Sequence, residues 1–242
     1  MELLAAVGLS LLGSGGGVVL AAPLLLVKQR LRQQIVPGLI RYAVGTLLGV
    51  AMLALVPEAL ESLSATAALG ALLAGILTFF MLEKFVLWRH CHTDDCEAHD
   101  ASVPLVLIGG ALHNLTDGVI VGAALLTSVP LGLTTALAVA AHQIPQEVSD
   151  YAILLDAGYS RARAFALNAL SASTCAIGAA AVWGTSSWAP LALPYILAFA
   201  AGSFLYVAMS DLIPGLHRNA VDVGAVRQVV FIAAGIGTII FL

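Results

Sequence analysis

Long apolar stretches separated by short polar breaks run through the whole sequence. Eight of them reach the length of about 20 apolar residues that a helix needs to cross a bilayer. They cover residues 3–27, 36–57, 66–89, 104–127, 131–155, 162–184, 190–213 and 221–242. The last stretch has the weakest signal, because Asp222 and Arg227 lie near its start. The pattern predicts an all-α, polytopic integral membrane protein with eight transmembrane helices.

The composition supports this fold class. The 242 residues are 60% hydrophobic and 10% charged, whereas soluble domains have about 25% charged residues. No polar stretch is long enough to bury a core of its own, so we expect residues 1–242 to form a single transmembrane domain. No basic patch or aromatic platform indicates nucleic-acid binding.

The positive charges predict how the chain is oriented. All ten Lys and Arg residues lie in or beside the breaks that follow the first, third, fifth and seventh stretches: Lys28, Arg30, Arg32, Arg41, Lys84, Arg89, Arg161, Arg163, Arg218 and Arg227. Positive residues concentrate in cytoplasmic loops. We therefore expect these four breaks in the cytoplasm and both termini on the extracytoplasmic side, in the cell (inner or plasma) membrane.

Two stretches are rich in small residues. These are GSGGG at residues 13–17 and SASTCAIGAAA at residues 171–181. Small residues let helices approach closely in a membrane, so tight packing is the favoured interpretation. A divided helix that lines a transport path is the alternative.

Polar residues gather on the fourth and fifth predicted helices. HNLTDG begins at His113, and HQIPQEVSD runs from His142 to Asp150. At about 100° per residue, one face of the fourth helix carries His113, Asn114 and Asp117. One face of the fifth carries His142, Gln143, Gln146, Glu147 and Asp150. The turn SVPLG is so short that the two helices must be antiparallel neighbours, and their polar faces can meet.

This pair of faces suits a metal ion. Imidazole, carboxylate and carboxamide groups together favour Zn, Fe, Mn, Co or Cd over Ca or Mg. Pro145 also leaves the carbonyl of Ala141 without its helical donor, beside His142. The alternative is a network of hydrogen bonds between helices, each worth about 0.6–2 kcal/mol. Two histidines and three acids at membrane depth are costly, which favours the metal site.

The third break has its own composition. RHCHTDDCEAHD, residues 89–100, lies within a His-, Cys- and acid-rich cytoplasmic loop at about residues 90–103. Its histidines and thiolates suit zinc, but their spacing matches no recognised zinc-finger pattern. Metal binding and a solvated, disordered loop therefore both stay open.

Four segments resemble the ZIP family (Zrt-, Irt-like protein) of divalent metal transporters. HNLTDGVIVGAA and HQIPQEVSDYAIL are similar to its fourth- and fifth-helix patterns, HNxxDG and HExPHExxDFAIL. LVPEAL, residues 55–60, resembles the end of its second helix, and AGSFLYVAMSDLIPGL, residues 201–216, its seventh-helix pattern AGxFLYVALxDxxPE. The His-rich loop lies where the family has a variable cytoplasmic loop. The resemblance spans nearly the whole chain.

The resemblance implies an eight-helix carrier that moves a divalent metal, zinc foremost, into the cytoplasm by alternating access. Its site would lie between the fourth and fifth helices. The metal is cargo, and no enzyme cofactor is expected. The resemblance leaves the oligomeric state open, a homodimer included.

The resemblance also assigns roles to matching residues. It makes ligands or near-ligands of His113, Asn114, Asp117 and His142. Gln146 takes a main ligand position, and Gln143 the position that would bridge a second metal. Glu147 matches a polar position, and Asp211 an acidic position that fits a relay or exit site.

The chain departs from the family pattern at several positions. HExPHE becomes HQxPQE, so that Gln143 replaces a carboxylate and Gln146 a histidine. Gly215 replaces a glutamate, and apolar Val50 and Ala54 lie where many members have Asp and His. A carboxamide is a weaker metal ligand than carboxylate or imidazole. We therefore predict one principal metal ion rather than two.

Two other functions are compatible with the same residues. An intramembrane metallohydrolase could use the histidines, but the chain lacks HExxH, and HQIPQE lacks the general base between paired histidines. A metal sensor or non-transporting relative is the other alternative, and the two glutamines favour it.

Overall fold

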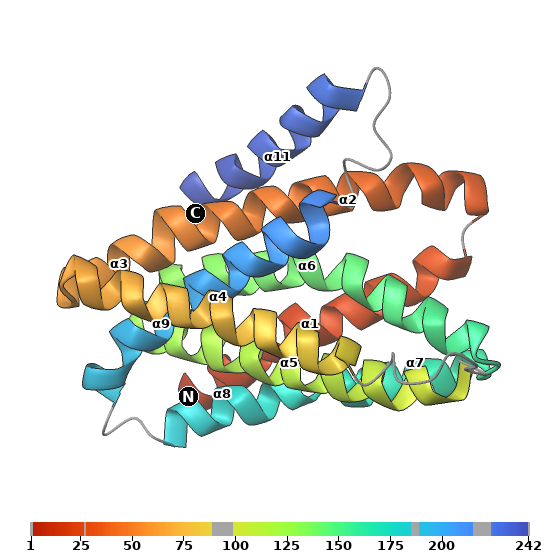
Figure 1. Ribbon diagram of the computed structural model, residues 1–242, viewed down its shortest axis with the longest axis horizontal. Helices are drawn as coiled ribbons and strands as arrows, with labels where there is room; N and C mark the ends of the chain where they lie inside the picture. The colour runs from red at the N-terminus through yellow and green to blue at the C-terminus, as the bar shows by residue number, and fades with distance from the viewer. Residues whose placement is uncertain (1, 27, 89–98, 185–188, 215–223, 242) are drawn as a thin grey trace.

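The computed structural model describes residues 2–26, 28–88, 99–184, 189–214 and 224–241 (Figure 1). Every regular element in these ranges is a helix, which confirms the all-α class for the described part of the chain. The helices are α1 (Glu2–Leu26), α2 (Gln29–Val50), η1 (Ala51–Leu55), α3 (Val56–Ser62), α4 (Ala65–Trp88), α5 (His99–Thr127), α6 (Val129–Asp156), α7 (Arg161–Ala172), α8 (Thr174–Gly184), α9 (Ala189–Tyr206), η2 (Val207–Leu212) and α11 (Gly224–Ile240).

These helices coincide with the predicted apolar stretches. α2, the π-helical turn η1 and α3 continue into one another, as do α9 and η2. Six helical rods among the described residues are long and apolar enough to cross a membrane. α6 is not among them because its polar residues between His142 and Asp150 lower its hydropathy, and α11 is not among them because it has only 17 residues. The chain is therefore a multi-pass helical protein, and its orientation stays a prediction.

The ends of two helices differ from the prediction. The second rod covers residues 29–62 rather than 36–57, and α5 begins at His99 rather than residue 104. The polar segment QRLRQQ at the start of α2 lacks the hydropathy of a membrane span, but Gln, Arg and Leu are good helix formers. Hydropathy therefore located the apolar part of this rod and missed its polar helical end.

The glycines of α5 and α8 hold these helices close together. A Cβ on Gly118 would overlap the backbone carbonyl of Cys175, and one on Gly178 would overlap that of Leu115. The small-residue run 171–181 therefore does pack tightly. The same rod is also divided at Ser173, between α7 and α8. There the Thr174 hydroxyl donates to the carbonyl of Ala111 at 2.6 Å, which ties α8 to α5.

The Gly13–Gly17 run stays helical and faces α6. A Cβ on Gly17 would come within 2.9 Å of the Gln143 Cβ, and one on Gly13 within 3.4 Å of Val139. α1 is continuous through this run, so tight packing is confirmed here as well. The contact places α1 directly behind the polar part of α6.

An apolar cluster lies among α2, α5, α6 and α9. Its fully buried members include Leu47, Val50, Ile120, Val121, Ala138, Val139, Leu197 and Phe204. The outward faces instead expose large apolar side chains, for example Leu73, Leu77 and Val230. Exposed apolar surface of this extent suits contact with lipid. Figure 1 shows α5 and α6 inside this arrangement and α11 at its edge against α2.

Candidate metal centre

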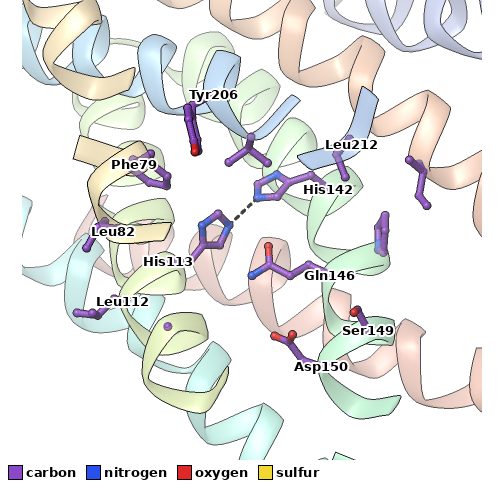
Figure 2. A pocket seen from close by; sticks show the side chains of 14 residues that line it. Phe79, Leu82, Leu112, His113, His142, Gln146, Ser149, Asp150, Tyr206 and Leu212 are labelled. Carbon is purple, nitrogen blue, oxygen red and sulfur yellow. Dashed lines mark hydrogen bonds between the residues drawn. The ribbon is translucent and has the colours of Figure 1, made fainter. Parts of the chain in front are cut away.

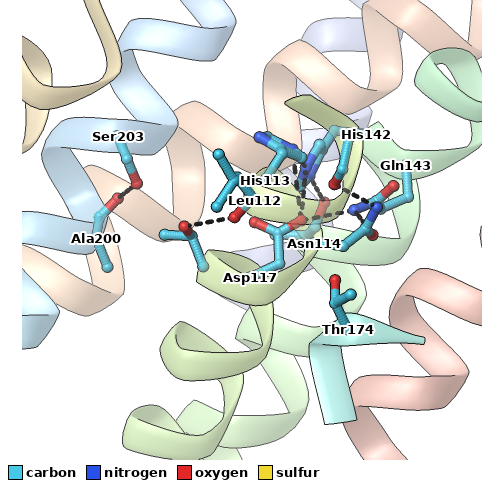
Figure 3. Close-up of polar contacts among 12 residues, drawn as sticks. Leu112, His113, Asn114, Asp117, His142, Gln143, Thr174, Ala200 and Ser203 are labelled. Atoms are coloured by element: carbon cyan, nitrogen blue, oxygen red, sulfur yellow. Dashed lines mark hydrogen bonds and ion pairs between the residues drawn. The ribbon is translucent and has the colours of Figure 1, made fainter. Parts of the chain in front are cut away.

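Three side chains from α5 and α6 converge on one point. The ligand atoms of His113, Asp117 and His142 all lie within 4.8 Å of one another. Asp117 Oδ2 is 3.5 Å from His113 Nε2 and 3.3 Å from His142 Nε2, and the two Nε2 atoms are 3.1 Å apart (Figure 3). His113 and Asp117 are one turn apart on α5, and α6 brings His142 to them. The predicted meeting of the two polar faces is confirmed for these residues.

A hydrogen bond at Nδ1 orients the His142 ring for metal binding. His142 Nδ1 is 3.1 Å from the carbonyl oxygen of Ala138. A carbonyl only accepts, so Nδ1 is the donor, and in the neutral ring the lone pair then lies on Nε2. Metal-binding histidines commonly hold their second nitrogen in this way. The arrangement thus directs Nε2, the metal-binding nitrogen of the neutral ring, at Asp117 and His113.

Gln143 acts as a hydrogen-bond donor beside this cluster. Its Nε2 donates to Asn114 Oδ1 at 2.8 Å and to Asp117 Oδ2 at 2.7 Å. Asn114 in turn donates to the carbonyl of Gly110 at 2.8 Å. Asn114, Asp117 and Gln143 are all buried. Gln143, itself bonded to Asn114, therefore holds the Asp117 carboxylate in place, while Asp117 Oδ1 has no hydrogen-bond partner within the described residues.

A cavity of about 490 Å³ leads to the cluster (Figure 2). His113 and His142 lie in its wall, and Gln146, Ser149 and Asp150 continue the wall along α6. Its apolar lining includes Ile40, Leu82 and Leu212. The rings of Phe79 and Phe204 pack edge-on against His113 and His142, with centroids 6.0 and 5.9 Å apart. The cluster is thus open to small ions on one side and covered by apolar groups on the other.

Comparison with known proteins identifies the family. The profile of the family described as ZIP Zinc transporter matches residues 88–242. The chain belongs to the ZIP family. Zinc transporter ZIP6 of Homo sapiens is 37% identical over 149 residues, which are 60% of this chain and 20% of that protein. Zinc transporter ZIP13 of Pongo abelii is 34% identical over 215 residues, 82% of this chain and 64% of that protein.

A yeast protein gives a similar result. Zinc transporter YKE4 of Saccharomyces cerevisiae is 30% identical over 216 residues, 76% of this chain and 62% of that protein. The chain therefore spans a fifth of ZIP6 and less than two thirds of ZIP13 and YKE4. The family to which the chain belongs is described as one of zinc transporters.

The remaining candidate ligands of this ZIP chain lie in different surroundings. Gln146 faces the cavity, next to His113 and Asp150 in Figure 2. Glu147 is buried on another side of α6, and its Oε2 has no hydrogen-bond partner in the described part of the chain. Asn168 of α7 donates to the backbone carbonyl of Glu147 at 3.3 Å. Asn168 is not among the predicted site residues, although an Asn inside an apolar stretch is a usable signal.

Two predicted features fall outside what the structure describes. The backbone of Asp211 belongs to η2, but its side chain is outside the described residues. Residues 89–98 of the His- and Cys-rich loop are outside them as well. Metal binding by Asp211 and by this loop therefore stays a prediction.

Proposed function

We propose that this ZIP protein carries a divalent transition-metal ion, zinc foremost, across the cell (inner or plasma) membrane into the cytoplasm. The observation that carries the proposal is the convergence of His113, Asp117 and His142 at the wall of a cavity large enough for a hydrated ion. Two nitrogen donors and one carboxylate are a ligand set typical of zinc. Residues 1–242 would act as one transmembrane domain.

Gln146 is the fourth ligand in this proposal. It lies in the cavity wall beside His113 and His142, so its carboxamide oxygen can complete a tetrahedral set. An amide oxygen binds zinc more weakly than a histidine nitrogen would. A carrier must bind its cargo and also release it, so one weak ligand on the open side favours release into the cavity.

The position of the cavity supports a cytoplasmic exit. The residues that line it lie near the helix ends that lead into the positively charged breaks. Ile40 is near the first break, Leu82 and Gly109 are near the third, Asp150 is near the fifth and Leu212 is near the seventh. The positive-inside rule assigns these breaks to the cytoplasm. Beyond the cluster, the other side is filled by apolar residues such as Leu47, Ile120 and Val139. In this proposal the cavity faces the cytoplasm. Alternating access would close it and open a path through the apolar residues on the other side of the cluster.

Reconstitution tests the proposed activity. The purified chain in proteoliposomes should accumulate zinc faster than empty vesicles, read by a zinc-sensitive dye inside. Cadmium, iron and manganese test the selectivity in the same assay. Absence of flux for all four metals contradicts the proposal. Zinc binding in detergent without any flux would instead favour the sensor alternative.

We expect one high-affinity zinc ion per chain. The Gln143 amide hydrogens already bond to Asn114 Oδ1 and to Asp117 Oδ2, so these oxygens have fewer lone pairs left for a second ion beside the first. Gln143→Glu removes this donor and adds a carboxylate of nearly the same shape, so it should raise the stoichiometry to about two ions. Isothermal titration calorimetry in detergent measures both values.

The exposed Gln34 offers a matched control. Gln34→Glu makes the same chemical change at the start of α2, away from the cluster, and should leave the stoichiometry at about one ion. Two equivalent high-affinity zinc ions in the unmodified chain would contradict the one-metal prediction.

A further inference from the structure

Buried hydroxyl groups without hydrogen-bond partners are concentrated on α1 and α6. Within the described residues, Ser10 and Thr135 have such hydroxyls, and both side chains are at most 1% exposed. α1 and α6 pack together there, with Gly13 against Ala136 and Val139. An unpaired polar group buried among apolar residues destabilises a fold. A buried hydroxyl without a partner therefore indicates a role other than stability.

Thr135 differs from the other threonines of α5 and α6. The adjacent Thr134 bonds back to the helix, with its hydroxyl 3.0 Å from the carbonyls of both Pro130 and Leu131. Thr116 and Thr127 of α5 make the same kind of bond to the carbonyl four residues earlier. In the described part of the chain, the Thr135 hydroxyl makes none.

Thr135 lies on the transport face of α6. It is seven residues before His142 and eleven before Gln146. At 100° per residue, each of these two side chains is therefore within about 20° of Thr135 around the helix axis. The rise along the helix places Thr135 about 10 Å from His142. It lies on the side opposite to the cavity, because Ser149 and Asp150 line the cavity in the other direction. Its neighbours on α6, including Leu131, Ala138 and Val139, belong to the apolar cluster.

We propose that the Thr135 hydroxyl is an oxygen ligand for the incoming metal ion on the outer side of the cluster. It replaces a water molecule of the ion's hydration shell while the ion passes the apolar cluster towards Asp117 and His142. A neutral hydroxyl holds a divalent transition-metal ion weakly, which suits a transient position on the path. This inference rests on the proposed transport function.

The test compares three variants in proteoliposomes with zinc outside. Thr135→Val has the same shape without the hydroxyl, Thr135→Ser keeps the hydroxyl, and Thr134→Val removes the neighbouring one. Zinc uptake should fall about fivefold in Thr135→Val, as expected for one lost ligand bond. It should stay within about twofold of the parent rate in Thr135→Ser and Thr134→Val.

Two further measurements separate transport from stability. Equilibrium zinc affinity in detergent should be unchanged in Thr135→Val, because Thr135 is two turns from the cluster. Its melting temperature should rise, since an unpaired buried hydroxyl is lost. Uptake by Thr135→Val at the parent rate overturns this inference but leaves the proposed function intact. Absence of uptake by the unmodified chain overturns the proposed function and with it this inference.

Discussion

Replacing both His113 and His142 with Ala should abolish zinc uptake. The substitutions remove both nitrogen ligands, whose Nε2 atoms are 3.1 Å apart, and leave only Asp117 of the three converging groups. Loss of an outer partner of a metal ligand commonly costs 10–100-fold in affinity. Loss of two direct ligands should therefore weaken zinc binding by more than about 100-fold. Uptake of zinc into proteoliposomes and calorimetric titration in detergent measure the two effects.

Thr116→Ala provides the control on the same helix. Thr116 is not one of the three converging residues, and its hydroxyl donates to the carbonyl of Leu112. This variant should transport zinc at the parent rate. Size-exclusion profiles of all the variants show whether the fold is retained. Uptake by the folded double-alanine variant at the parent rate would exclude the cluster as the transport site.

Gly118→Ala should destabilise the protein and also impair zinc binding. The added Cβ would overlap the backbone carbonyl of Cys175, and backbone cannot move aside as a flexible side chain can. α5 and α8 would have to separate, at a cost of about 1–3 kcal/mol or more. α5 also carries His113 and Asp117, so the shift would alter the spacing of the metal ligands. Thermal melts with and without zinc measure the stability and the binding.

Gly16→Ala is the matched control for this change. It makes the same substitution inside a helix, but no heavy atom lies within 4 Å of the Cβ it would add. Alanine also favours the helical state, so the melting temperature should stay the same or rise. A Gly118→Ala variant as stable as Gly16→Ala would show that the contact between α5 and α8 is not close in the protein.

The polar faces of α5 and α6 could be predicted because side chains on a helix repeat every 3.6 residues. His113 and Asp117 had to share a face once their segment was helical, and the short turn made α6 an antiparallel neighbour. What spacing could not predict is the role of each group. Gln143, one residue from His142, donates two hydrogen bonds to α5. Gln146, one turn further on, lines the cavity.

The divided sixth rod shows a second limit. The apolar stretch 162–184 predicts one helix, and the structure has a break at Ser173. Ser173 bonds to the carbonyl of Leu170 at 2.7 Å, and Thr174 bonds across to α5. Hydroxyl groups that compete for backbone carbonyls can interrupt a helix. Whether they do so depends on the neighbouring helix, which hydropathy does not report.

The sequence by itself determined the helices, their order and the two polar faces. A bilayer leaves an apolar chain of this length no alternative to the helix, because every backbone group must be bonded internally. Only the tertiary structure decided which polar side chains meet: His113, Asp117 and His142 converge, and Glu147 is buried next to Asn114 and Asn168. It also placed the cavity at one end of the cluster and the unpaired Thr135 hydroxyl at the other. These outcomes depend on how far helices approach and how they are rotated, which the packing of residues such as Gly118 and Gly17 sets.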